Sequence, residues 1–230
     1  PADEGDAKAV VCRHGYIILM AETLEQGDVT DAIPWAYEIA DQFRADVLVY
    51  DADGMGAPIM KLTFDAYASG RQTIAPFYGS GEIQDKEKKY GEVEGEHDRT
   101  LKTNGETFEN FRAQAATMLR DRFHEAWRIR QQIEEGGIAL NVDVNKLISI
   151  DSSVTKFFEL EAELSRPKRE WSENGKIKVE SKKKMKGRDV DSPNLFDGCI
   201  MCVSVKTPNP RKRARVRTRA IGSRDRGLGL

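Results

Sequence analysis

Short apolar runs alternate with amphipathic stretches along the first third of the chain. Residues 9–13 (AVVCR) and 16–22 (YIILMAE) favour β-structure, and the His14-Gly15 pair between them predicts a hairpin in which His14 is a turn residue. Residues 28–31 (DVTD) offer N-caps for an amphipathic helix that ends near Phe43.

A strand, a helix and a strand follow, at residues 45–50, 58–69 and 73–78. Residues 45–50 (ADVLVY) are long enough for a central strand and too few to fill a helix. The order hairpin, helix, strand, helix, strand predicts an α/β fold with a mixed sheet flanked by helices. Residues 79–105 break this rhythm, because they are rich in Gly, Glu, Lys and Asp and have little periodicity, and they predict a flexible charged insertion.

The longest helix is predicted from Thr107 to the Gly136-Gly137 pair. Its apolar stripe has helical spacing and predicts a buried face formed by Phe108, Phe111, Ala115, Met118, Leu119, Phe123 and Trp127. Arginines on this helix could face DNA, but ion pairs three or four residues apart explain most of them; these are Arg112, Arg120, Arg122, Arg128 and Arg130.

Shorter elements complete the pattern. Residues 145–150 predict a short strand or helix, and residues 157–164 predict a helix. An Asn174-Gly175 turn predicts a second hairpin between residues 170–171 and 176–179. Ser192 and Pro193 suit the start of a final helix, which is predominantly apolar and therefore expected to be buried.

Asp51 follows directly on the predicted central strand. A carboxylate at the C-terminal end of such a strand lies at the edge where open α/β sheets bind ligands. The residues around it, Asp53, Gly54 and Gly56, are also ordinary turn formers, so a solvated strand-to-helix loop is the alternative.

Asp197 lies one turn into the final helix, among apolar residues. An unpaired buried carboxylate costs several kcal/mol, so Asp197 needs a partner such as a metal ion or a basic residue. The alternative, an interaction with the helix dipole, favours exposed positions. Asp51 and Asp197 are therefore the two candidate functional carboxylates.

Basic residues are concentrated in two places. Residues 206–230 hold nine Lys or Arg and one acid, which gives them a net charge of +8. Because the whole chain has a net charge of −2, the rest of it carries about −10. This tail is predicted to be disordered and to bind a polyanion, with a solubilising role as the alternative. The lysines before the final helix form either a solvated face or a phosphate-steering surface. The candidate DNA contacts are Lys182, Lys183, Lys184 and Lys186 there, and Arg211, Lys212, Arg213 and Arg215 in the tail.

Three cysteines, Cys12, Cys199 and Cys202, lie in apolar surroundings, which predicts packing roles in a reducing, cytosolic compartment. No apolar run is long enough to predict a membrane span. No histidine- or cysteine-rich cluster, nucleophile triad or phosphate-binding loop of the form G-x-x-x-x-G-K-[ST] occurs in the sequence.

The sequence resembles the C-terminal nuclease domain of the large terminase subunit of tailed bacteriophages that package by the headful mechanism. The resemblance covers residues 1 to about 203 and rests on YDADGMGAP (50–58), RPKREWSENGKIKVESK (166–182) and KKKMKGRDVDSPNLFDGCIM (182–201). It implies an RNase H-like nuclease domain over 1–205, followed by the basic tail over 206–230.

The resemblance also implies a Mg²⁺- or Mn²⁺-dependent endonuclease, with two ions, that cuts concatemeric double-stranded DNA in the host cytoplasm. Its implied partners are DNA, the portal protein, the small terminase subunit and a packaging ATPase domain of the same polypeptide. Asp51 and Asp197 match the family's acids. Asn194 and Gly198 depart from the usual Asp and Ala. The family's first metal ligand precedes a segment like PADEGD, so it lies outside this chain; Asp3, Asp6 and Asp53 are the candidate substitutes or additions.

Phosphodiester hydrolysis by two divalent cations requires several oxygen ligands from separate elements, and Asp51 and Asp197 are of the right type. A DNA-binding or portal-docking module with structural acids is the competing hypothesis, and an RNA-strand nuclease or junction resolvase is a third. Under the nuclease hypothesis the two acids converge in one pocket. An arginine paired with Asp197, or acids on opposite faces of the sheet, would overturn it.

Overall fold

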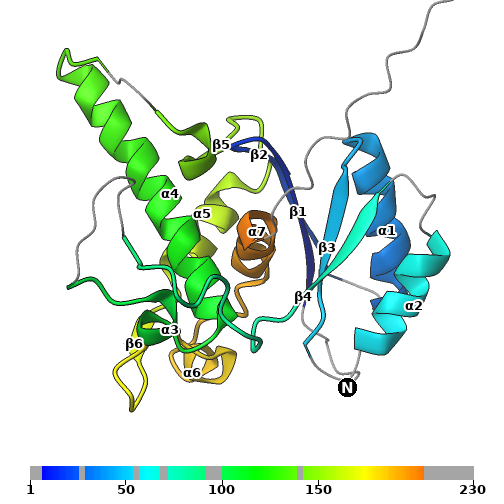
Figure 1. Ribbon diagram of the computed structural model, residues 1–230. Helices are drawn as coiled ribbons and strands as arrows, with labels where there is room; N and C mark the ends of the chain where they lie inside the picture. Colours follow the sequence, from blue (N-terminus) through cyan, green and yellow to red (C-terminus); the bar gives the residue numbers. More distant parts are fainter. Residues whose placement is uncertain are drawn as a thin grey trace, which may run out of the picture.

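The computed structural model describes residues 7–25, 29–53, 57–67, 72–91, 100–138 and 142–204. Figure 1 shows strands flanked on both sides by helices, as the sequence predicted. The elements in chain order are β1 (Lys8–His14), β2 (Ile17–Leu24), α1 (Val29–Gln42), β3 (Val47–Asp51), α2 (Ala57–Tyr67), β4 (Thr73–Phe77), α3 (Asn104–Thr107), α4 (Phe111–Glu134), the 3₁₀ helix η1 (Val144–Lys146), β5 (Ser149–Ile150), α5 (Phe157–Ser165), β6 (Arg169–Trp171), β7 (Ile177–Val179), α6 (Lys182–Lys186) and α7 (Asn194–Ser204).

The strands form three hydrogen-bonded groups among the described residues. β1 and β2 form the predicted antiparallel hairpin, and β5 pairs with β2 in parallel. Gly15 adopts a φ of +58° in the hairpin turn, a conformation that glycine reaches without a Cβ penalty. β3 and β4 pair in parallel, and β6 and β7 form the second predicted hairpin. The mixed sheet is therefore divided between β1 and β3, which share no ladder.

Helix α7 lies at the centre of the larger core. It packs against β1, α4, α5, β3 and β2, and buries Leu195, Phe196, Cys199, Ile200 and Val203. This confirms that the final helix is buried because it is apolar on most sides. A second, smaller cluster joins α1, β3 and α2 through Ile33, Tyr37, Tyr50, Ala52 and Phe64.

Helix α4 starts later than the sequence predicted. Thr107 belongs to the separate short helix α3, which Thr103 and Glu106 begin with a reciprocal capping box. Asn110 then caps α4 through a bond from the Ala113 N–H at 2.9 Å. Trp127, predicted to lie on the buried stripe, is exposed.

The described parts of the predicted insertion are anchored to neighbouring elements. The N–H groups of Asn104 and Gly105 donate to the carbonyls of Lys88 and Lys86 at 2.8 and 3.0 Å. Residues 92–99, which include His97, lie outside the described part of the chain, as does the tail. In the described segments no helix is both long and apolar enough to cross a membrane.

Candidate metal centre

Asp51 is the last residue of β3, as predicted. Its Oδ1 accepts the N–H of Asp53 at 3.0 Å, so the chain turns away from the sheet directly after the carboxylate. Burial raises the pKa of Asp51, and the Asp53 N–H opposes this shift. The charges of Asp53 and Asp197 raise the pKa further, whereas that of Lys182 lowers it. Asp51 therefore lies within electrostatic reach of Asp197 and Lys182.

Asp53 lies beside the loop that follows β4. Its two carboxylate oxygens accept the N–H of Ser80 at 2.9 Å and the hydroxyl of Ser80 at 2.7 Å. A Cβ on Gly79 would lie 3.1 Å from Phe77 and 3.2 Å from Asp53, so a side chain there would crowd both residues. Both Asp53 oxygens thus have protein partners, which makes Asp53 a residue that fixes the loop.

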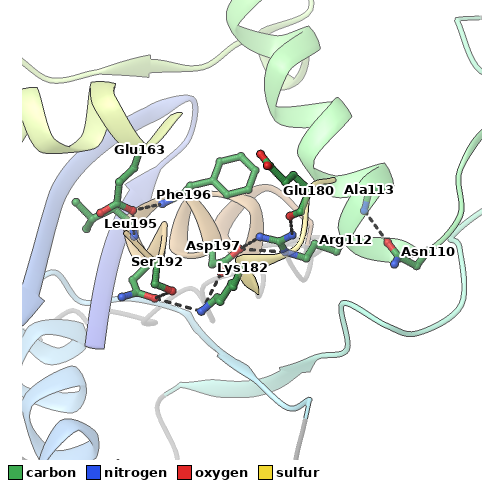
Figure 2. A network of polar contacts seen from close by, with 11 residues as sticks. Asn110, Arg112, Ala113, Glu163, Glu180, Lys182, Ser192, Leu195, Phe196 and Asp197 are labelled. Atoms are coloured by element: carbon green, nitrogen blue, oxygen red, sulfur yellow. Dashed lines mark hydrogen bonds and ion pairs between the residues drawn. The ribbon is translucent and has the colours of Figure 1, made fainter. Parts of the chain in front are cut away.

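Asp197 projects from the first part of α7, and its side chain is 20% exposed. Oδ1 accepts two N–H groups from Arg112 of α4, from Nη2 at 2.8 Å and from Nε at 3.1 Å. Arg112 also donates to the Glu180 carbonyl at 3.4 Å and lies over the Phe196 ring. Figure 2 shows Arg112 and Lys182 directed at the same carboxylate.

Lys182 approaches the other oxygen of Asp197. The distance from Lys182 Nζ to Asp197 Oδ2 is 3.6 Å, longer than a charge-assisted hydrogen bond. Nζ also donates to Asn194 Oδ1 at 3.3 Å. The two basic residues therefore neutralise Asp197 unequally: Oδ1 is firmly bonded, and Oδ2 is held only loosely.

Asp51, Asp197 and Lys182 line one cavity of about 1560 Å³. The two acids line this cavity from β3 and α7, which pack against each other, and the charge of Asp197 raises the pKa of Asp51. A shared metal site formed by the two acids stays a prediction. The Arg112–Asp197 pair is the observation that was expected to overturn the nuclease prediction, and that criterion was too strict for the geometry found. Because both arginine bonds go to Oδ1, the pair is not the two-oxygen fork that occupies a carboxylate fully.

Glu163 of α5 holds the start of α7 in place. Its Oε2 accepts the N–H groups of Leu195 and Phe196 at 2.7 and 3.2 Å (Figure 2). These are first-turn donors that have no partner within the helix. Burial raises the pKa of Glu163, and the two backbone bonds oppose the shift. Glu163 thus positions the helix that carries Asp197.

The donor chemistry suits a hard divalent cation, since carboxylate oxygens are the ligands that Mg²⁺ and Mn²⁺ prefer. Asp51 and Asp197 are the described residues that would hold it. No group of three or more His, Cys, Asp or Glu side chains in the described ranges is arranged to hold a metal ion. Asp3 and Asp6 lie outside these ranges.

The predicted DNA-contacting lysines differ in their surroundings. Lys182 lies at the acidic site, and Lys184 is paired with Glu170 at 2.8 Å. Lys183 and Lys186 are exposed on α6. The predicted tail contacts Arg211, Lys212, Arg213 and Arg215 lie outside the described residues.

Arg112 and Glu163 are the site residues that sequence reasoning missed. Arg112 was assigned to local ion pairing, which Arg128 and Arg130 do form with Glu125 and Glu134. No sequence signal connects Arg112 with an acid 85 positions away. Glu163 gave no distinct signal, because its helix also carries Glu159 and Glu161.

Solved structures similar to this chain identify its class. No protein-family model matches the chain, and no curated protein matches it significantly by sequence. The nuclease domain of the large terminase subunit gp2 of bacterial virus Sf6 matches with a TM-score of 0.73 and 28% identity, over 90% of this chain and 86% of that one. A mutant of that domain with manganese and beta-thujaplicinol gives 0.75 and 29%, again over 90% and 86%. A mutant with calcium gives 0.72 and 28%, over 87% and 83%.

The chain therefore has an RNase H-like α/β fold. Its likeness to the nuclease domain of a phage large terminase subunit, predicted from three sequence motifs, is confirmed over most of its length.

Proposed function

We propose that this chain is a Mg²⁺- or Mn²⁺-dependent endonuclease domain that cuts concatemeric double-stranded DNA during phage genome packaging. The observation that carries the proposal is that Asp51 and Asp197 line one cavity, in a fold similar to a terminase nuclease domain. The manganese and calcium in structures of the similar domain support a divalent cation as cofactor.

Asp51 and Asp197 would supply oxygen ligands from two separate elements. A pair of divalent cations bound there would activate a water molecule and neutralise the charge that develops on the scissile phosphate. Lys182 and Arg112 place positive charge beside the acids, where it would attract and orient the DNA backbone. Asp53 and Ser80 would hold the loop beside Asp51.

The test is nicking of supercoiled plasmid by the chain with Mg²⁺ or Mn²⁺. Asp51→Asn and Asp197→Asn should each reduce the nicking rate by at least about 100-fold. Loss of a residue that only supports a metal ligand costs about 10–100-fold in activity, and loss of the ligand itself should cost more. Asp65→Asn is the matched control, because the side chain of Asp65 is exposed on α2 and pairs with Lys61. This variant should leave the cleavage rate unchanged.

A DNA-binding or portal-docking module without cleavage is the second candidate. The Arg112–Asp197 pair and the lack of a third acid among the described residues favour it. Salt-sensitive DNA binding without metal-dependent cleavage would establish this candidate and remove the first. Preference for an RNA–DNA hybrid or a four-way junction would assign the same site to a different substrate.

A further inference from the structure

The loop that follows β4, residues 79–81, lies between the elements that carry the two candidate acids. Asp51 ends β3, the strand that pairs with β4, and Asp197 lies in α7, which packs against α4. The serine of this loop bonds to the segment after β3, and its glycines bond to the start of α4. The 79–81 loop is thus a physical link between the two carboxylates.

Ser80 reaches Asp51 through Asp53. The Ser80 hydroxyl donates to Asp53 Oδ1 at 2.7 Å, and the Ser80 N–H donates to Asp53 Oδ2 at 2.9 Å. The Asp53 N–H in turn donates to Asp51 Oδ1 at 3.0 Å. Because two charge-assisted bonds from one residue hold both oxygens of the Asp53 carboxylate, its orientation is fixed. Ser80 therefore influences the backbone N–H that orients Asp51.

The glycine carbonyls of the loop reach Asp197 through Arg112. The carbonyl oxygen of Gly79 accepts the Arg112 N–H at 2.8 Å. The carbonyl oxygen of Gly81 accepts the Phe111 N–H at 3.2 Å. Both donors belong to the first turn of α4 and have no partner within the helix. The Arg112 side chain then donates to Asp197 Oδ1 (Figure 2). The loop thus holds the helix start from which Arg112 reaches the second acid.

The alternative is that the loop only caps α4 and that Ser80 only closes a turn. Backbone carbonyls perform the capping, so capping does not need the Ser80 hydroxyl. Ser80 and Asp53 are both exposed, and water can replace a bond between them at little cost in stability. A hydroxyl with a purely local role would therefore have no effect on a metal ion bound beside Asp51, and the two interpretations differ in a measurable way.

We propose that Ser80 is a positioning residue of the candidate metal centre. Its hydroxyl and N–H hold the Asp53 carboxylate, and the Asp53 N–H then orients the carboxylate of Asp51, which lines the same cavity as Asp197. This inference rests on the proposed function, in which Asp51 and Asp197 hold a divalent cation. Loss of a residue that supports a metal ligand lowers metal affinity by about 10–100-fold.

The affinity of the full chain for Mn²⁺, measured by isothermal titration calorimetry, tests the proposal. Ser80→Ala should weaken Mn²⁺ binding by about 10-fold, whereas Ser80→Thr keeps the hydroxyl and should bind Mn²⁺ as the wild type does. Ser153→Ala is the matched control. Ser153 also donates its N–H and its hydroxyl to a carboxylate, that of Asp151, at 2.9 and 2.6 Å, and both residues lie outside the cavity wall. This control should leave the Mn²⁺ affinity unchanged.

Two further measurements isolate the chain of bonds. The Asp53 amide is protected from hydrogen exchange by its bond to Asp51, so Ser80→Ala should speed its exchange by about 10-fold in the absence of metal. Asp53→Ala removes the acceptor of the Ser80 hydroxyl. Ser80→Ala added to Asp53→Ala should therefore weaken Mn²⁺ binding no further.

The outcomes separate this inference from the proposed function. If the wild-type chain binds Mn²⁺ and Ser80→Ala binds it equally well, the inference is overturned and the proposed function stands. An unchanged exchange rate of the Asp53 amide in Ser80→Ala would also overturn the inference, as would equal weakening of Mn²⁺ binding by Ser153→Ala. A wild-type chain that binds no Mn²⁺ would overturn the proposed function and the inference with it.

Discussion

Arg112 and Asp197 form an ion pair between α4 and α7 in which both arginine bonds reach a single carboxylate oxygen, Oδ1. The two side chains are 21% and 20% exposed, so water screens the pair only in part. Oδ2 is left with Lys182 at 3.6 Å. The pair therefore connects two core helices and leaves one oxygen of the candidate ligand weakly engaged.

Replacement of Arg112 should destabilise the protein. Arg112→Met removes the partner of a partly buried carboxylate together with the contacts to the Glu180 carbonyl and the Phe196 ring, and we expect a loss of about 2 kcal/mol in the free energy of unfolding. Urea unfolding at neutral pH measures this. Arg128→Met, which removes an exposed pair with Glu125, is the control and should cost less than about 0.5 kcal/mol. Equal losses in both variants would contradict a bracing role for Arg112.

Glu163 should be needed as a backbone acceptor more than as a charge. Glu163→Ala leaves the N–H groups of Leu195 and Phe196 without their partner and should cost about 1–3 kcal/mol. Glu163→Gln keeps an acceptor oxygen and should cost less. A Gln variant as unstable as the Ala variant would show that the acceptor is not what matters.

The stability contributed by Glu163 should depend on pH. Its pKa is raised above the ordinary 4.5, so between 4.5 and the raised value the folded state holds more protons than the unfolded state. The free energy of unfolding should therefore fall as pH rises through this window. Glu163→Gln cannot titrate, so its stability relative to wild type should increase over the same window. Parallel pH curves for the two proteins would refute the assignment.

Gly198 allows α7 to pack closely on β1. A Cβ there would lie 2.8 Å from Cγ2 of Val11, so Gly198→Ala should cost about 1–3 kcal/mol through overpacking. Val11→Ala in the same chain removes the obstructing methyl groups. The double variant should therefore lose less than the sum of the single losses, by about 0.5–3 kcal/mol.

Gly105→Ala serves as the control for the Gly198 series. Its added Cβ would meet atoms no closer than 3.4 Å, an ordinary contact, so no loss of stability is expected. Strict additivity in the Gly198 and Val11 cycle would mean that the two residues do not limit each other.

Deletion of residues 206–230 should weaken DNA binding and reduce its salt dependence. The tail holds nine basic residues and one acid, and each phosphate contact contributes about 0.9 to the slope of log affinity against log salt. Binding titrations at several salt concentrations give the slope, and an unchanged unfolding midpoint shows that the folded part is intact. An unchanged slope would remove the tail from the DNA interface.

Local signals in the sequence predicted most elements correctly. Alternation and the His14-Gly15 pair gave the first hairpin, and the apolar final helix was predicted to be buried. The start of α4 was wrong because Thr103 and Asn110 form two successive caps, which divide the predicted helix into α3 and α4. The prediction that Trp127 is buried was also wrong, because an apolar stripe on a helix does not show how far along the helix the core extends.

Long-range pairing was beyond the sequence. Asp51 and Asp197 were identifiable because one carboxylate follows an apolar strand and the other lies within an apolar helix, and both patterns can be recognised in the local sequence. Their shared cavity followed only from the family resemblance, and the partners Arg112 and Lys182 could be assigned only once α4, α6 and α7 were placed. The division between β1 and β3 likewise depends on ladders that no local pattern specifies.

The most direct test of the central claim is a crystal of the chain soaked in Mn²⁺ and measured for anomalous scattering. The account predicts an ion that contacts a carboxylate oxygen of Asp51 and a carboxylate oxygen of Asp197, with the Lys182 Nζ displaced from Oδ2. An ordered site without such an ion, with Asp197 still bonded to both Arg112 and Lys182 at saturating Mn²⁺, would contradict it.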